Sequence, residues 1–116
     1  MSNLNEDLLK QLNKLKNEYI SDLPNKVSDI EKLLADYVNN GFDSETFHTF
    51  HRNCHSIAGT SSVHKLTEVS QAARDIELFI QPLVETDSPL NSAEIDNITE
   101  LVAGLRLAIE SLLVES

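Results

Sequence analysis

Hydrophobic residues recur at spacings of three and four along most of the chain, which is the pattern of amphipathic helices. The first run consists of Leu4, Leu8, Leu12, Leu15 and Tyr19. Its helix is predicted to end near Ser21, because Pro24 disfavours helical geometry in the residue before it. A second helix is predicted to begin at Pro24, which suits a first helical turn, and to end at Asn40–Gly41.

Three more helices are expected after this point. One is capped by Asp43 or Ser44, ends at a turn over residues 63–65, and buries Phe47, Phe50, Cys54, Ile57 and Ser61. The next buries Val69, Ala72, Ala73, Ile76 and Phe79, and residues 85–91 form a polar loop. The last helix starts at a capping box formed by Asn91 and Glu94, and its apolar side consists of Ile95, Ile98, Val102, Leu105, Ile109 and Leu112.

Each predicted helix is apolar on one side only, so each must bury that side against the others. Short connections favour antiparallel neighbours. We therefore predict an all-α fold: an antiparallel up-down four-helix bundle made by the last four helices, with the first helix packed on one end. Residues 1–116 form a single domain, and three glycines and three prolines are too few for the turns of a many-stranded sheet.

The chain is acidic, with 19 Asp and Glu against 9 Lys and Arg and a net charge of −10. This balance argues against binding to nucleic acid or to an anionic membrane surface. No apolar run approaches the roughly 18 residues of a membrane span, and the first residues contain no apolar signal segment. Cys54 is the only cysteine, so no intramolecular disulfide forms. We expect a monomer in the cytoplasm.

The helix over residues 44–62 carries the candidate chemistry. At about 100° per residue, its buried side lies roughly 120° from His55, so this imidazole points outward. Gly59 lies one turn further along the same face and costs about 1 kcal/mol relative to alanine. Its missing side chain would let a partner reach the ring. An exposed imidazole with one neutral nitrogen can act as a nucleophile.

The run His55-Ser-Ile-Ala-Gly-Thr-Ser-Ser-Val-His-Lys-Leu66, followed by Ala72-Ala-Arg-Asp-Ile-Glu77, resembles the signature of histidine-containing phosphotransfer (HPt) domains. In that family the phosphorylated histidine precedes a leucine, usually a lysine, and a glycine. A second glycine and a leucine follow, and a Leu-Glu pair closes the next helix. The resemblance spans about residues 44–80, and Tyr19 with Leu23-Pro24 is also similar to the family. His55 matches the phosphorylated histidine.

The resemblance implies a phosphorelay carrier that takes a phosphoryl group on His55 from the aspartate of a receiver domain and passes it to another receiver. The expected partners are response-regulator receiver domains and a hybrid sensor histidine kinase. Such a carrier is an intermediate of transfer rather than a self-sufficient enzyme. It has no cofactor or metal of its own, and Mg²⁺ is expected on the partner receiver only. The positions expected at the partner-binding rim are His51, Arg52, Ser56, Ala58, Gly59 and Ser62.

Two residues depart from the family pattern. Ala58 stands where the family usually has lysine, which removes a positive charge near the phosphoryl oxygens. Lys65 stands in place of the second glycine, where a left-handed residue is costly without glycine. Alanine at position 58 is also found in HPt domains attached to receiver and diguanylate cyclase modules, so the chain is expected to suit the N-terminal piece of a longer signalling protein. The alternative is a module that docks a receiver without being phosphorylated.

Other kinds of site are less well supported. His48, His51 and His55 share one helix face, but three ligands from one straight helix converge poorly on a single ion, so no metal site is predicted. Cys54 points about 100° away from His55, which disfavours a Cys–His dyad. Glu77 is expected to form an exposed helical salt bridge, and the alternative is that it pairs or hydrogen-bonds near the site.

Overall fold

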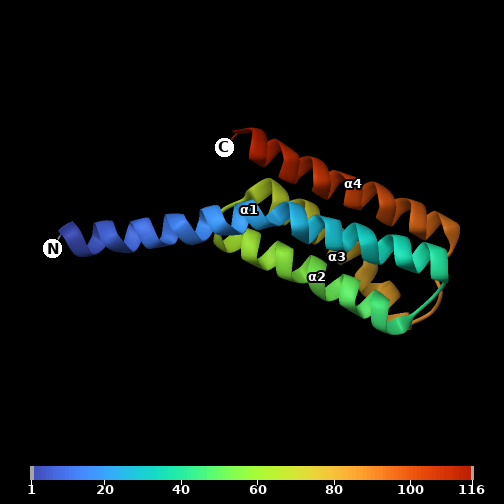
Figure 1. The fold of residues 1–116 in the computed structure, drawn as a ribbon. Helices are drawn as coiled ribbons and strands as arrows, with labels where there is room; N and C mark the ends of the chain where they lie inside the picture. Colours follow the sequence, from blue (N-terminus) through green and yellow to red (C-terminus); the bar gives the residue numbers. More distant parts are fainter. Residues whose placement is uncertain (1, 116) are drawn as a thin grey trace.

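The computed structural model describes residues 2–115, with side chains from residue 4 onward. It contains four helices, α1 (Ser2–Asn40), α2 (Ser44–Val63), α3 (Thr67–Thr86) and α4 (Ser92–Glu115), and no strand within the described residues. The helices form an antiparallel bundle in which each contacts its two neighbours: α1 packs on α2 and α4, and α3 packs on α2 and α4 (Figure 1). The prediction of an all-α fold is confirmed.

The predicted break between two N-terminal helices is wrong, because α1 runs without interruption through Pro24. A proline inside a helix removes one hydrogen bond and crowds the carbonyl four residues earlier. Here the apolar side continues in phase across the proline. Leu23, Val27 and Ile30 are fully buried in the bundle, and their burial offsets that cost.

The first part of α1 also does not pack on the end of the bundle. It projects beyond the other helices (Figure 1), and the Cα positions extend over 58 × 27 × 19 Å. Tyr19 is the first residue of the stripe that contacts another helix, through a 3.0 Å hydrogen bond between its hydroxyl and that of Ser61. The leucines before it stay exposed, since α2 has ended at Val63 and nothing described lies beside them.

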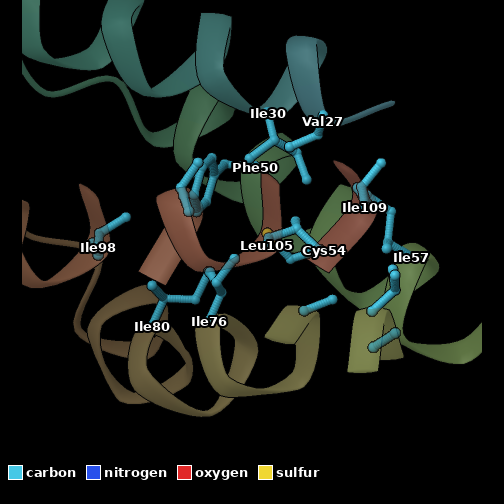
Figure 2. Packing of buried hydrophobic residues seen from close by; sticks show 14 of the residues in the cluster. Val27, Ile30, Phe50, Cys54, Ile57, Ile76, Ile80, Ile98, Leu105 and Ile109 are labelled. Atoms are coloured by element: carbon cyan, nitrogen blue, oxygen red, sulfur yellow. The ribbon is translucent and has the colours of Figure 1, made fainter. Parts of the chain in front are cut away.

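The core lies between the four helices, and its aliphatic side chains converge from all of them (Figure 2). The predicted stripe of α2 is confirmed: each of its members is at most 3% exposed, namely Phe47, Phe50, Cys54, Ile57 and Ser61. The largest fully buried side chains in the bundle are Leu23, Ile30, Ile76, Ile80, Ile98, Leu105 and Ile109. At about 1.5–3 kcal/mol for each large apolar side chain removed from water, these residues hold the helices together.

Two helix ends follow the predicted capping residues, whereas Asp43, which precedes α2, makes no side-chain capping hydrogen bond. Gly41 has a φ of +88° after the last residue of α1, and its N–H donates to the Tyr37 carbonyl at 2.9 Å. The capping box before α4 is present. The Asn91 N–H donates to a Glu94 carboxylate oxygen at 2.9 Å, and the Glu94 N–H donates to the Asn91 side-chain oxygen at 2.8 Å.

Lys65 adopts the left-handed conformation that glycine would adopt more easily. Its φ is +60°, its N–H donates to the Ser62 carbonyl at 3.0 Å, and the Leu66 N–H donates to the Ser61 carbonyl at 2.8 Å. These bonds close the end of α2 and aim the chain back toward the core, where Leu66 is buried. The turn therefore forms with a lysine in the left-handed position, at a conformational cost.

We expect Lys65→Gly to stabilise the domain, because glycine adopts a positive φ without the Cβ clash. The free energy of unfolding should rise by about 1 kcal/mol, measured by urea denaturation. Lys65→Ala is the control, since it removes the charge but keeps the Cβ, and it should give no gain. A glycine variant no more stable than the alanine variant would contradict this account.

Arg106 on α4 joins α1 through a two-pronged ion pair with Glu31, with both N···O distances at 2.6 Å. This hydrogen bonding lowers the pKa of Glu31 below its ordinary value of 4.5. A carboxylate with a depressed pKa stabilises the fold above its unfolded-state pKa and loses that contribution as the pH falls through its folded-state pKa. Both side chains are about one-third exposed, so solvent screens the pair.

Arg106→Gln is therefore expected to lower the free energy of unfolding at neutral pH by at most about 1 kcal/mol. The difference from the unmodified chain should shrink as the pH falls below 4.5, where Glu31 becomes protonated. Thermal unfolding across a pH series measures this, with Arg74→Gln as an arginine control outside the pair. A difference that stays constant into acid would contradict the ion-pair explanation.

Candidate functional site

His55 lies on the outer face of α2, and its side chain is 72% exposed. Its ring Nδ1 contacts a carboxylate oxygen of Glu77 on α3. The Glu77 side chain is only 13% exposed, since it lies in the groove between the two helices. An exposed imidazole is thus held at one nitrogen by a partly buried carboxylate.

Close packing between α2 and α3 brings these two residues together. Small side chains occupy the contact, with Ala58 and Ala73 almost fully buried and Ser70 at 8% exposed. The Ser70 hydroxyl donates to the Ala58 carbonyl at 2.8 Å. Because small residues let helix axes approach, Glu77 can reach across to the ring of His55.

The contact defines which ring nitrogen is available for chemistry. An ionised carboxylate can only accept a hydrogen bond, so Nδ1 of His55 carries the hydrogen. In the neutral ring the other nitrogen, Nε2, then has a free lone pair. With the ring largely exposed, Nε2 can attack an electrophile that a partner presents.

The ring borders a shallow depression between α2 and α3. Besides His55 and Glu77, it is lined by His51, Arg52, Arg74, Leu78 and Gln81. Two guanidinium groups therefore stand around the imidazole, although the chain as a whole carries a charge of −10. Such groups can hydrogen-bond the oxygens of a phosphoryl group.

Most of the predicted rim positions lie on the accessible surface around this ring. His51 and Arg52 line the depression with His55. Ser56, Gly59 and Ser62 are exposed on α2. A Cβ added at Gly59 would meet nothing within 4 Å, so glycine at this position leaves space above the helix rather than relieving a contact inside the bundle.

Ala58 is a correction to the predicted rim. It is 1% exposed, because the face of α2 that carries it is covered by α3. The helical pattern of α2 alone identified the side facing the core, but it did not reveal how far α3 extends toward His55. The side chain at position 58 therefore presents nothing to a partner.

Cys54 faces the core, as predicted. Its burial, together with the nearby charge of Glu77, raises the pKa of the thiol to about 12. The thiol thus stays protonated and is a poor nucleophile. It packs between helices, away from the exposed ring of His55.

The three histidines of α2 do not act together in this structure. His48 pairs with Asp87, just beyond the C-terminal end of α3, at 3.6 Å, whereas His55 pairs with Glu77. Within residues 2–115 no group of three or more His, Cys, Asp or Glu side chains is placed to hold a metal ion. Nor is any helix in this range long and apolar enough to cross a membrane.

Sequence reasoning missed the contribution of α3 to the site. Glu77 was expected in an exposed helical salt bridge, with pairing near the site as the alternative, and the structure shows this alternative: it is the partner of the His55 ring. Arg74, Leu78 and Gln81 were not identified at all. Arg74, Leu78 and Gln81 recur at spacings of four and three, which places them on one stripe of α3. This stripe lies on one side of Glu77, and the buried Ala73, Ile76 and Ile80 lie on its other side. That spacing was the available signal.

A model of the Hpt domain family matches residues 14–113, which include most of α1 and all of α2 and α3. The chain belongs to the Hpt domain family. Hpt domains act in phosphotransfer within two-component phosphorelays and interact with the receiver domains of response regulators. A search of curated proteins found no match.

The contact with Glu77 predicts the tautomer of this Hpt domain's histidine. In the neutral ring the hydrogen should reside on Nδ1, whereas the neutral side chain of free histidine favours the hydrogen on Nε2. Glu77→Ala should release this bias, and ¹⁵N NMR of the imidazole at alkaline pH measures it. Glu85→Ala, an exposed carboxylate elsewhere on α3, is the control. A hydrogen found mainly on Nε2 in the unmodified domain would refute the assignment.

Proposed function

We propose that this Hpt domain carries a phosphoryl group on Nε2 of His55, taking it from the aspartyl phosphate of one receiver domain and passing it to the aspartate of another. The observation that carries the proposal is the exposed ring with its Nδ1 held by Glu77. This arrangement orients the ring and leaves one nucleophilic nitrogen facing solvent. The buried thiol of Cys54 offers no competing nucleophile.

In the accepting step, the Nε2 lone pair attacks phosphorus in line with the bond to the aspartate oxygen. The N–P bond forms as that P–O bond breaks, and the aspartate leaves as a carboxylate. The ring then carries positive charge, and the hydrogen bond from Nδ1–H to the Glu77 carboxylate stabilises that charge. Transfer to the next receiver is the reverse of these steps with a different aspartate. The receiver supplies Mg²⁺, so the carrier needs no cofactor.

We further propose that Arg52 and Arg74 supply the positive charge that lysine at position 58 provides elsewhere in the family. Both line the depression beside His55. Arg52 is steadied by a 3.1 Å hydrogen bond to the Thr49 hydroxyl. Arg74 is exposed and lies one helical turn before Glu77, so its guanidinium can reach a phosphoryl group on the ring.

The proposed docking face for the receiver comprises the exposed side of α2 around His55 and the neighbouring edge of α3. It combines Ser56, Gly59 and Ser62 with the apolar Leu78, which is 61% exposed. The initial donor is proposed to be a hybrid sensor histidine kinase in the same cytoplasmic relay. The chain is a carrier and not a self-sufficient enzyme, since no segment resembles a nucleotide-binding loop.

The second candidate function is receiver docking without phosphorylation. It is favoured by one observation: Ala58 is buried and provides no charge where the family usually has lysine. This candidate predicts that a receiver binds equally well after His55→Gln and that no phosphohistidine forms.

The test is incubation with a phosphorylated receiver domain, followed by intact-mass measurement. We expect a mass gain of one phosphoryl group that is lost in acid and is absent in His55→Gln. His48→Gln is the matched control, since it changes a histidine two turns earlier that pairs with Asp87 outside the depression, and it should still be phosphorylated. Measurable docking without any mass gain, across several receivers, would overturn the carrier function in favour of the docking module.

The same assay, followed in time, tests the supporting residues. Loss of ring orientation in Glu77→Ala should slow transfer by about 10- to 100-fold. Arg74→Gln should slow it by about tenfold, as expected for one charged hydrogen bond in the transition state. Arg106→Gln removes an arginine remote from the site and should leave the rate unchanged. Equal rates in Arg74→Gln and the Arg106 control would refute the role of Arg74.

A further inference from the structure

The N-terminal extension of α1, defined as residues 4–18, exposes a continuous apolar stripe. Leu4, Leu8, Leu12 and Leu15 are between 53% and 76% exposed. They continue directly into Tyr19 and the buried Leu23, which begin the core face of the same helix. The apolar stripe that packs into the bundle therefore continues toward the N-terminus for four more helical turns, and no described residue covers its leucines (Figure 1).

No described residue of the chain packs on the leucines of this extension. It is about 22 Å long at the usual rise per residue. Helices of about 12–15 residues are marginal in water unless an apolar face is packed against a partner. The helical form of residues 4–18, together with its leucine stripe, thus indicates that another surface covers it.

We propose that a second copy of this chain covers the stripe, so that two N-terminal extensions pair antiparallel and the two bundles lie at opposite ends of the dimer. This inference is independent of the phosphotransfer function. It departs from the expectation of a monomer.

The charges of the extension complement those of an antiparallel copy. Its first half, residues 4–10, carries Glu6, Asp7 and Lys10 and a net charge of −1, and its second half, residues 12–18, carries Lys14, Lys16 and Glu18 and a net charge of +1. Antiparallel pairing places the acidic half of one copy beside the basic half of the other. Parallel pairing would place like charges together. The extension has no net charge, unlike the chain as a whole at −10, so two copies meet without the repulsion expected between their bundles.

The position of α2 excludes the parallel arrangement. Tyr19, the last member of the stripe, packs on the C-terminal end of α2, where its hydroxyl bonds to Ser61 and its ring lies 5.2 Å from that of His64. The stripe therefore faces the side on which α2 begins to cover α1. Two parallel copies joined through that face would bring each α2 into the space of the other α1.

The antiparallel arrangement has no such conflict. With Leu8 of one copy opposite Leu12 of its partner, residues 4–16 of the two extensions lie side by side, before the level of Tyr19. His55 lies about two turns above the end of α2 and stays open to a receiver. The dimer has two-fold symmetry, with the same surface contributed by both copies.

The test is sedimentation equilibrium of the full chain, in which we expect a reversible species of twice the 13.0 kDa chain mass. Leu8→Glu combined with Leu12→Glu should raise the dissociation constant at least about 100-fold, as expected for losing two buried leucines. Leu107→Glu is the matched control, a leucine 63% exposed on α4, and should leave it unchanged. A chain that stays at 13.0 kDa up to millimolar concentration would overturn the proposal, and so would a dimer that survives the double substitution.

Small-angle scattering separates the two orientations. Two 58 Å molecules that overlap along extensions of about 22 Å give a particle roughly 95 Å long. A dimer no longer than one molecule would overturn the antiparallel arrangement. Retention of the Nδ1–H tautomer of His55, measured by NMR on the double variant, would show that the bundle remains folded.

Discussion

The close packing of α2 against α3 is the interaction on which the site depends. Ala58, Ser70 and Ala73 are small enough to let the two helices approach, and the hydroxyl of Ser70 bonds to the backbone of α2 at the contact. This approach places the Glu77 carboxylate against the ring of His55. A larger residue in place of Ser70 or Ala73 would hold the helices apart and leave the imidazole without its partner. Ala58 lacks the positive charge of the family's lysine, but it is part of the packing that orients the histidine.

The site works with few groups because its chemistry needs few. A phosphoryl carrier must present one nucleophilic nitrogen, hold the ring, and tolerate negative charge near it. The ring and its carboxylate meet the first two needs, and the guanidinium groups on either side of the depression suit the third. We propose that the receiver supplies the remaining catalytic groups. This division would explain how an acidic domain with a shallow depression beside its histidine takes part in phosphoryl transfer.

The same helix that closes the bundle also extends far beyond it. Pro24 did not end α1 because the residues on both sides of it share one apolar face, and burying Leu23 and Val27 outweighs one lost hydrogen bond. Continuity of that face has a second consequence. It carries the stripe past Val63 at the end of α2, and no residue within the described range 2–115 covers its leucines. A surface that appeared to belong to the interior of one molecule is therefore available to another.

The periodicity of apolar residues by itself determined that the protein is all-helical, which side of α2 is buried, and that His55 points outward, because these properties depend only on local helical geometry. The caps at Gly41 and Asn91 could be predicted in the same way, because a helix cap also depends on the local sequence. Tertiary structure decided the rest. Whether Pro24 breaks a helix depends on what is buried on both sides of it, and whether Ala58 is accessible depends on how far α3 covers α2. The pairing of His55 with Glu77 joins residues 22 positions apart on different helices. Such a contact is set by the distance between helix axes, which no pattern along one helix contains.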